Sequence, residues 1–248
     1  NTNQQHYSGQ AQLSYLAHAS AIVGLQVITP MMGLALVAAT LRGLFGGREK
    51  SATTTDITTN GAADVGNYWA DVIRPAVRFL LPLCLVWSLA LTSQGVPATL
   101  QGGPVATPID ASAQMAEQKI PLGPVAPMVA IKQLGTNGGG WYGPNSAVPL
   151  ENPTPFSNLL ETLALVLIPV SIAFMVGSFT GRRKFTALVF GTMLTMSLVS
   201  AGTAVWSESL SGTSSDIALM EGKEVRFGAG PSALWAAFTT QTSNGSVN

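Results

Sequence analysis

The sequence predicts an all-α membrane protein made of repeated units, and three observations lead to this fold class. Charged residues make up only 10% of the chain, against about 25% in a typical soluble domain. Four apolar stretches reach the length of about 20 residues that a membrane-spanning helix needs. Short uncharged loops rich in Thr, Asn and Gly recur beside these stretches. A chain of this composition would cover a soluble surface poorly, so we expect it to lie in a lipid bilayer.

The predicted membrane helices carry few charged residues or none. They cover residues 13–41, 79–95, 159–181 and 185–206. The second extends back through Ile73. Pro30, Pro82 and Pro169 lie inside these stretches, and a membrane helix tolerates them because neighbouring helices satisfy the freed carbonyls. Only the three basic residues 182–184 separate the last two stretches, which predicts a tight helical hairpin.

Lys and Arg gather in two of the connections, residues 42–72 and 182–184. Short loops rich in these residues stay on the cytoplasmic side of a membrane. Both connections are therefore predicted to lie inside. The connections formed by residues 96–121 and 207–228 then lie outside, together with the polar loops.

Residues 1–5, 135–140 and 242–246 form the first, second and third polar loops. Such loops offer backbone carbonyls and small side-chain oxygens without a fixed charge, which suits a partly dehydrated monovalent cation. The apolar segments 124–134 and 231–240 precede the last two loops and are too short to span a membrane. As re-entrant helices, they would point their partly negative carboxyl ends at the loops. The pattern predicts an ion pathway that holds a cation without a carboxylate.

The order of loops and helices occurs twice, which indicates an internal repeat. We expect the end of a first pore repeat at residues 1–41 and a cytoplasmic link at residues 42–72. A second pore repeat covers residues 73–181, and the start of a third covers residues 182–248. Because the chain opens inside one polar loop and stops inside another, we expect it to be a fragment.

Several passages of the sequence resemble one known family. They are Asn1-Thr2-Asn3 with Gln5, Tyr7, Ser8 and Gly9; residues 121–126; Ile131-Lys132 followed by residues 134–140; Glu151-Asn152-Pro153; and residues 220–224 with 226–228. They are similar to the KdpA family, the potassium-binding, channel-like subunits of the bacterial ATP-driven Kdp potassium transporter. The match runs the full length of the chain, and its long middle motif is highly specific. Two places depart from the family pattern: residues 141–144 stand where two Phe and an Asn-containing stretch are common, and Asn244 stands where Cys is frequent.

The resemblance implies a pseudo-fourfold pore of helix, re-entrant loop and helix units, similar to a potassium channel, in the bacterial inner membrane. It implies that this non-catalytic subunit binds potassium from outside in a selectivity filter. The ion would pass to the ATP-hydrolysing P-type subunit KdpB, with KdpC and KdpF as accessory subunits and without an organic cofactor. The implied filter positions are Asn1, Thr2, Asn3 and Gln5 in the first loop, Thr136, Asn137 and Gly138 in the second, and Ser243, Asn244 and Gly245 in the third. A fourth loop is absent from the sequence.

Other classes of function find less support in the residues. The 12 basic and 12 acidic side chains leave no net field to attract nucleic acid. Neither a Gly-Lys-Ser/Thr phosphate loop nor an Asp-Lys-Thr-Gly motif is present, so the energy for transport would come from a partner. A stand-alone channel or an ion-coupled potassium transporter would share the same pore. An intramembrane Ser protease would need His18 with Ser14 or Ser20, but the expected Gly-rich nucleophile loop is missing.

A few polar residues inside the predicted membrane segments have local interpretations. His18 is expected to bond a neighbouring helix. Glu161 follows Asn158 by three residues, which fits a helix capping box. Lys132 either points to an outer carboxylate or tunes ion entry. Gly138 is expected to accept no side chain, because a side chain would crowd the pore and disfavour a positive φ.

Overall fold

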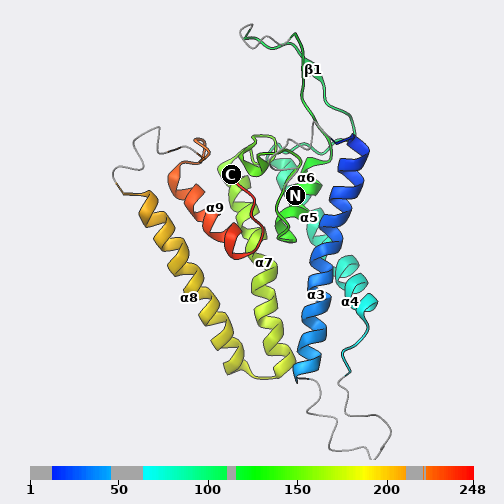
Figure 1. Ribbon diagram of the computed structural model, residues 1–248, viewed down its shortest axis with the longest axis vertical. Coiled ribbons are helices and arrows are strands. Elements are labelled where there is room, and N and C mark those ends of the chain that lie inside the picture. The colour runs from blue at the N-terminus through cyan, green and yellow to red at the C-terminus, as the bar shows by residue number, and fades with distance from the viewer. Residues whose placement is uncertain (1–12, 46–63, 111–115, 211–219, 221) are drawn as a thin grey trace, which may run out of the picture.

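Helices make up most of the computed structural model, which describes residues 13–45, 64–110, 116–210, 220 and 222–248 (Figure 1). In this part of the chain, four helices are long and apolar enough to cross a membrane. They cover Ala17–Phe45, Tyr68–Ser93, Pro155–Thr180 and Arg183–Glu208. The four predicted spans and the predicted all-α membrane fold are therefore confirmed.

The first two spans are each assembled from consecutive helical pieces. The first joins η1 (Ala17–Ile22) to α3 (Val23–Phe45), and the second joins α4 (Tyr68–Pro75), η4 (Ala76–Leu80) and α5 (Leu81–Ser93). Both η1 and η4 are π-helical, a widened turn that absorbs irregular hydrogen bonding inside a helix. In the second span this turn lies between Pro75 and Pro82, which both lack the amide hydrogen that a regular helix uses.

The predicted link of residues 42–72 is too long at both ends. Helix α3 continues to Phe45, and α4 already begins at Tyr68. The side chain of Asn67 caps α4 by accepting a hydrogen bond from the Ala70 amide at 3.0 Å. Asn is a favoured residue at this position, so the start of the helix was readable from the sequence. The middle of the link, residues 46–63, lies outside the described residues.

Helices α7 (Pro155–Thr180) and α8 (Arg183–Glu208) form the predicted hairpin. Gly181 ends α7 with a φ of 63°, a left-handed conformation that glycine adopts without steric cost. Close to the turn, a Cβ atom at Gly177 would overlap the side chain of Thr186 on α8. The two helices therefore approach closely at this end because Gly177 has no side chain.

Two short helices lie among the long ones, as predicted. They are α6 (Val125–Leu134) and α9 (Ala229–Gln241). Helix α6 packs against α3, α5 and α7, whereas α9 packs against α7 and α8. Every residue of α6 except Pro127 is buried, so this helix is the centre of the hydrophobic core. The remaining described elements are the short antiparallel pair β1 (Val105–Ala106) and β2 (Gln118–Lys119) and the 3₁₀ turn η6 (Asn145–Ala147).

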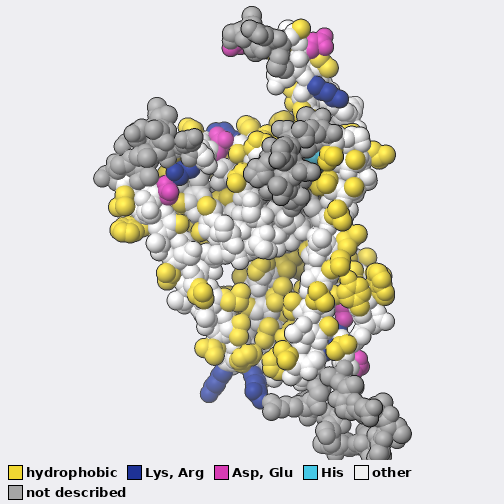
Figure 2. All heavy atoms as spheres, in the orientation of Figure 1, with side chains coloured by type: hydrophobic (Ala, Val, Ile, Leu, Met, Phe, Trp, Pro, Cys, Tyr) yellow, Lys and Arg dark blue, Asp and Glu magenta, His cyan; other side chains and the backbone are white. Residues whose placement is uncertain are grey.

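The short helices occupy one half of the molecule, and the α7–α8 turn lies at the opposite end (Figure 1). The end of α3 lies beside the start of α8, since the rings of Phe45 and Phe185 are 6.4 Å apart. Basic side chains gather at this end, and apolar side chains cover much of the surface between the two ends (Figure 2). The two basic connections thus begin on the same side, as the charge pattern predicts.

Candidate cation-binding site

The structure describes two of the three polar loops. Asn1, Thr2, Asn3 and Gln5 of the first loop lie outside the described residues. The second loop directly follows α6, and the third directly follows α9. The geometry of the site is therefore built from Thr136, Asn137 and Gly138 on one side and Ser243, Asn244 and Gly245 on the other.

The second and third loops share one pattern of backbone conformation. Thr136 and Ser243 have positive φ values of 51° and 60°, and Gly138 and Gly245 both have a φ of 70°. Asn137 and Asn244, which lie between them, do not have a positive φ. A positive φ is uncommon for Thr or Ser and persists only where the surroundings impose it. The same pattern at the end of two separate helices supports the internal repeat.

The two loops meet at Gly138. A Cβ atom on this residue would overlap the backbone carbonyl oxygen of Asn244. At Gly245, the equivalent position of the third loop, a Cβ atom would meet nothing within 4 Å among the described residues. Position 138 therefore requires glycine for two reasons: its φ is positive, and the neighbouring loop approaches it closely.

Asn137 attaches the second loop to α3, the helix that follows the first loop. Its Nδ2 donates to the carbonyl oxygen of Gln26 at 2.8 Å. Its Oδ1 lies 2.8 Å from the Thr29 hydroxyl, which shares its one proton with the Leu25 carbonyl, also at 2.8 Å. Gln26 also donates from Nε2 to the carbonyl oxygen of Gly138 at 3.3 Å. The Gln26 side chain therefore holds the backbone of the second loop, while Thr29 and the Gln26 carbonyl hold the side chain of Asn137.

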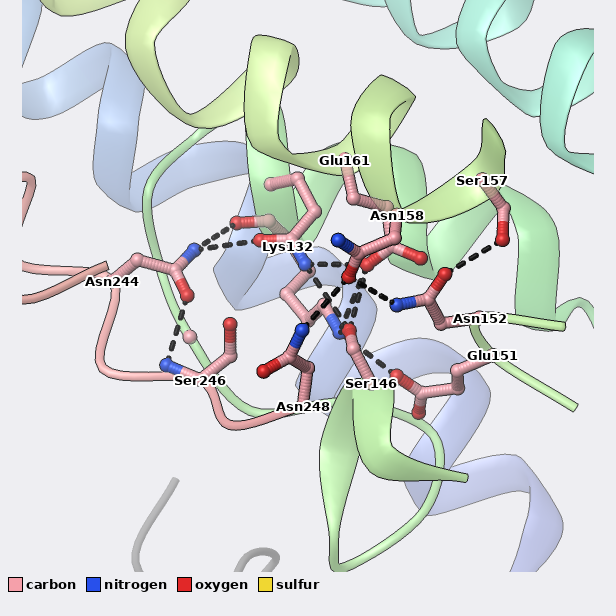
Figure 3. A network of polar contacts seen from close by, with 12 residues as sticks. Lys132, Ser146, Glu151, Asn152, Ser157, Asn158, Glu161, Asn244, Ser246 and Asn248 are labelled. Carbon is pink, nitrogen blue, oxygen red and sulfur yellow. Dashed lines mark hydrogen bonds and ion pairs between the residues drawn. The ribbon is translucent and has the colours of Figure 1, made fainter. Parts of the chain in front are cut away.

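Asn244 attaches the third loop to the end of α6. Its Nδ2 donates to the Lys132 carbonyl at 3.1 Å and to Gln133 Oε1 at 3.0 Å. Its Oδ1 accepts from the Ser246 amide at 2.9 Å. Figure 3 shows this side chain facing α6, with Ser246 on the same loop. The two asparagines at equivalent positions of the loops thus both bond a neighbouring unit.

The carboxyl ends of α6 and α9 point into these loops. The amide of Asn137 donates to the Lys132 carbonyl at 3.0 Å, and the amide of Gly245 donates to the Thr239 carbonyl at 3.1 Å. A helix carries roughly half a negative charge at this end. Both short helices therefore direct a partial negative charge towards the place where the second and third loops meet.

Three charged side chains are buried behind the second loop: Lys132, Glu151 and Glu161 have 0% exposed side chains. Lys132 Nζ lies 2.8 Å from Glu151 Oε2 and 3.9 Å from Glu161 Oε2. Glu151 also accepts from the Tyr142 amide at 2.9 Å. Lys132 therefore points to a carboxylate, as the first of its two predicted alternatives expects, and the tuning of ion entry stays a prediction. A Cβ atom at Gly140 would overlap the Glu151 carboxylate, so this glycine of the second loop makes room for the ion pair.

The predicted capping role of Glu161 is wrong. Helix α7 begins one turn earlier than that prediction requires, with Thr154 as its N-cap and Ser157 as the partner in the capping box. Glu161 instead accepts hydrogen bonds from Gln133 Nε2 and the Ser146 hydroxyl, both at 2.6 Å. These partners lie far away in the sequence, so the local spacing of residues was misleading.

Asn158 holds the segment that follows the third loop. Its Oδ1 accepts from Asn248 Nδ2 at 2.8 Å and from Asn152 Nδ2 at 2.9 Å. Ser157 donates to Asn152 Oδ1 at 2.6 Å. Figure 3 shows these side chains beside the buried charges. The start of α7 thus anchors segments on both sides of the site.

Residues 141–144, which depart from the family pattern, include two ring contacts and one buried phenol. Trp141 packs against His18, with ring centroids 4.3 Å apart. The Tyr142 hydroxyl donates to the Pro121 carbonyl at 2.7 Å. Burial, together with the charge of Glu151, raises the pKa of Tyr142, so this phenol stays protonated as a donor. The rings of Trp141, His18 and Tyr15 line a cavity together with Lys119 and Pro121.

The arrangement around His18 does not match the protease alternative. The Ser14 oxygen accepts from the Ala17 amide at 3.1 Å, and the Ser20 hydroxyl donates to the Leu16 carbonyl. Both serine oxygens thus bond their own helix. Among the described residues, no group of three or more His, Cys, Asp or Glu is placed to hold a metal ion.

Sequence reasoning missed several residues that shape the site: Gln26, Thr29, Gln133, Ser146 and Glu151 as the partner of Lys132. A signal existed for Gln26, because a polar side chain inside a membrane segment is a candidate for function. The same rule applies to Glu161, which was assigned to a cap instead. Gln133 and Ser146 stand outside the predicted spans, and only their contacts identify them.

The comparisons with known proteins cover the whole chain. Residues 1–248 match the family model KdpA, described as "Potassium-transporting ATPase A subunit". Proteins named "Potassium-transporting ATPase potassium-binding subunit" are 43% identical over 254 residues in Pseudomonas putida, 41% over 257 in Pseudomonas aeruginosa and 42% over 258 in Listeria monocytogenes. Each comparison covers 100% of this chain and 42% of the relative, so the chain spans less than half the length of these relatives. The chain belongs to the KdpA family of potassium-transporting ATPase A subunits.

Proposed function

We propose that this chain forms part of the potassium selectivity filter of an ATP-driven uptake complex, as its potassium-binding, channel-like subunit. The observation that carries the proposal is the contact of the second and third polar loops at Gly138 and Asn244. The two loops come from successive repeats and have the same backbone conformation. They are therefore suited to surround one axis with neutral oxygens.

The chemistry of these loops suits potassium. Selectivity among alkali ions depends on the number and field strength of the carbonyl oxygens that replace the hydration shell of the ion. The proposed filter positions are Asn1, Thr2, Asn3 and Gln5, then Thr136, Asn137 and Gly138, then Ser243, Asn244 and Gly245. The partial charges at the ends of α6 and α9 add a favourable field for a cation. Glu151 offsets the positive charge of Lys132, which would otherwise repel the ion.

In the proposed complex, a partner subunit supplies the energy for transport, and the charge pattern of the connections sets the orientation of this chain in the membrane. ATP hydrolysis lies on the P-type partner KdpB, with KdpC and KdpF as accessory subunits, and this subunit itself is non-catalytic. The complex lies in the bacterial inner membrane, and the basic connections face the cytoplasm by the positive-inside rule. The polar loops then open to the outside. The pore repeats of this proposal are those expected at residues 1–41, 73–181 and 182–248. The link between the first two is shorter than expected, because α3 ends at Phe45 and α4 begins at Tyr68.

The proposal is tested with Gly138→Asp in the complete transporter complex, reconstituted in lipid vesicles. An aspartate there would displace Asn244 and place a fixed charge beside the neutral oxygens. We expect a weaker apparent affinity for potassium and the admission of rubidium or ammonium. Gly222→Asp is the matched control, because Gly222 also has a positive φ and has nothing within 4 Å of its Cβ position. Unchanged affinity and unchanged discrimination in Gly138→Asp would refute the filter assignment.

A second measurement separates the pump subunit from a stand-alone channel or an ion-coupled transporter. Deletion of the ATP-hydrolysing partner should abolish potassium uptake by cells that depend on this complex. Uptake that remains intact without the partner would favour a pore that works alone.

A further inference from the structure

The buried charges behind the second loop do not balance. Lys132 is paired with Glu151 at 2.8 Å, whereas Glu161 lies 3.9 Å from the same Nζ atom. Both carboxylates are fully buried, and burying a charge is costly unless it is paired and hydrogen-bonded. Glu161 also lies inside α7, a candidate membrane span, where ionisable residues are expensive and usually functional. The ion pair alone therefore does not explain Glu161.

The contacts of Glu161 are with neutral donors. Its Oε2 accepts from Gln133 Nε2 at 2.6 Å and from the Ser146 hydroxyl at 2.6 Å. The Oε2 atom of Glu161 thus acts as an acceptor in both contacts. Gln133 therefore turns its NH₂ group to Glu161 and its Oε1 atom the other way. A glutamine at position 161 would not impose this choice, because an amide can either donate or accept.

Gln133 links Glu161 to the third loop. Gln133 Oε1 accepts from Asn244 Nδ2 at 3.0 Å, and the same NH₂ group of Asn244 donates to the Lys132 carbonyl at 3.1 Å. Asn244 Oδ1 is then left to accept from the Ser246 amide at 2.9 Å. The carbonyl oxygen of Asn244 is the atom that lies against Gly138. Figure 3 shows Glu161 on α7, Lys132 on α6 and Asn244 on the third loop around this network.

We propose that Glu161 is a specificity-determining positioning residue, whose carboxyl oxygen keeps Gln133 turned to accept from Asn244 and thereby helps to hold the third loop against the second. The inference rests on the proposed function, because it explains how the two loops keep the spacing that a filter requires. Glu161 acts through Gln133 and Asn244 and need not touch the ion. Without the carboxylate, Gln133 can turn its NH₂ group towards Asn244, and the third loop then loses one of the two hydrogen bonds that join Asn244 Nδ2 to α6.

The experiment compares Glu161→Gln with Asp71→Asn in the complete complex in lipid vesicles. Asp71 also lies in a span, but it is partly exposed and pairs with Arg42, near the end of α3 that lies beside the start of α8. ATPase activity and uptake are measured over a range of potassium and rubidium concentrations. We expect Glu161→Gln to reduce the discrimination between the two ions by about tenfold, the effect of losing one charge-assisted hydrogen bond. Asp71→Asn should stay within about twofold of the wild type, as expected for a partly exposed ion pair.

A swap of the two side chains tests the orientation argument directly. Gln133→Glu alone would place two carboxylates against each other and should reduce discrimination. In the double variant Gln133→Glu/Glu161→Gln, position 133 becomes the acceptor-only group and can accept from both the new amide at position 161 and Asn244. Discrimination should return towards the wild-type value. This recovery distinguishes an orienting role from simple filling of space.

Each outcome decides the inference. Wild-type discrimination in Glu161→Gln, or an equal loss in Asp71→Asn, would overturn it. If Glu161→Gln does not assemble, the swap decides: a double variant that neither assembles nor discriminates better than Gln133→Glu also overturns it. A wild-type complex without preference for potassium would refute the proposed function itself. A selective wild type with an equally selective Glu161→Gln would remove only the role of Glu161.

Discussion

Gly138 and Gly245 provide a matched pair of positions that separates backbone strain from contact between the loops. Both have a φ of 70°, but only at Gly138 would a Cβ atom overlap the carbonyl of Asn244. Alanine at either position costs about 1–2 kcal/mol for the left-handed conformation. At Gly138, overpacking against the neighbouring backbone adds about 1–3 kcal/mol. Because each 1.4 kcal/mol is about a factor of ten in affinity, Gly138→Ala should weaken potassium binding about tenfold more than Gly245→Ala.

The assay is a potassium titration of ATPase activity in the purified complete complex. Assembly of each variant is checked by the ratio of subunits after gel filtration, so that a loss of complex is not counted as a loss of affinity. Equal affinities for the two alanine variants would show that the contact at Asn244 contributes nothing to binding. A larger effect of Gly245→Ala would refute the reasoning from the geometry of the two loops.

Two further substitutions test the residues that hold the second loop. Lys132→Met leaves two carboxylates buried without their cation and should destabilise the complex by about 3–5 kcal/mol. Thermal melting of the purified complex would show this as a lower Tm, partly restored by adding Glu151→Gln; a Tm like that of the wild type would contradict the ion pair. Thr29→Val removes the hydrogen bond to Asn137 Oδ1 and should weaken apparent potassium affinity about fivefold, from a loss of about 1 kcal/mol. Thr40→Val is its control, since Thr40 is on the same helix, is also exposed and bonds only its own helix; equal affinity in the two variants would exclude a role for Thr29.

The membrane helices were predictable because each is a local property of the chain. Length and the lack of charge are enough to identify a span, and the structure extends the predicted spans by only a few residues. The short helices before the second and third loops were also readable from the sequence. Their apolar character, short length and following glycines are again local features. The start of α4 was missed, although Asn67 is a typical N-cap residue.

The charged residues behind the second loop show where local reasoning fails. Glu161 has the spacing of a capping box with Asn158, yet its partners are Gln133 and Ser146. Lys132 could be assigned no single partner, because its ion pair with Glu151 depends on how the chain returns after the second loop. Long-range contacts of this kind are determined by packing, and no short pattern encodes them.

The sequence by itself determined the membrane setting, the order of the helices and the polar loops that follow the two short helices. Only the tertiary structure decided which loops meet and which atoms come into contact. Gly138 and Gly245 have the same φ and equivalent places in their repeats, yet among the described residues a neighbouring loop meets only Gly138. The difference arises because the third loop packs onto Gly138, and a contact between two repeats depends on the placement of whole helices rather than on the residues beside either glycine.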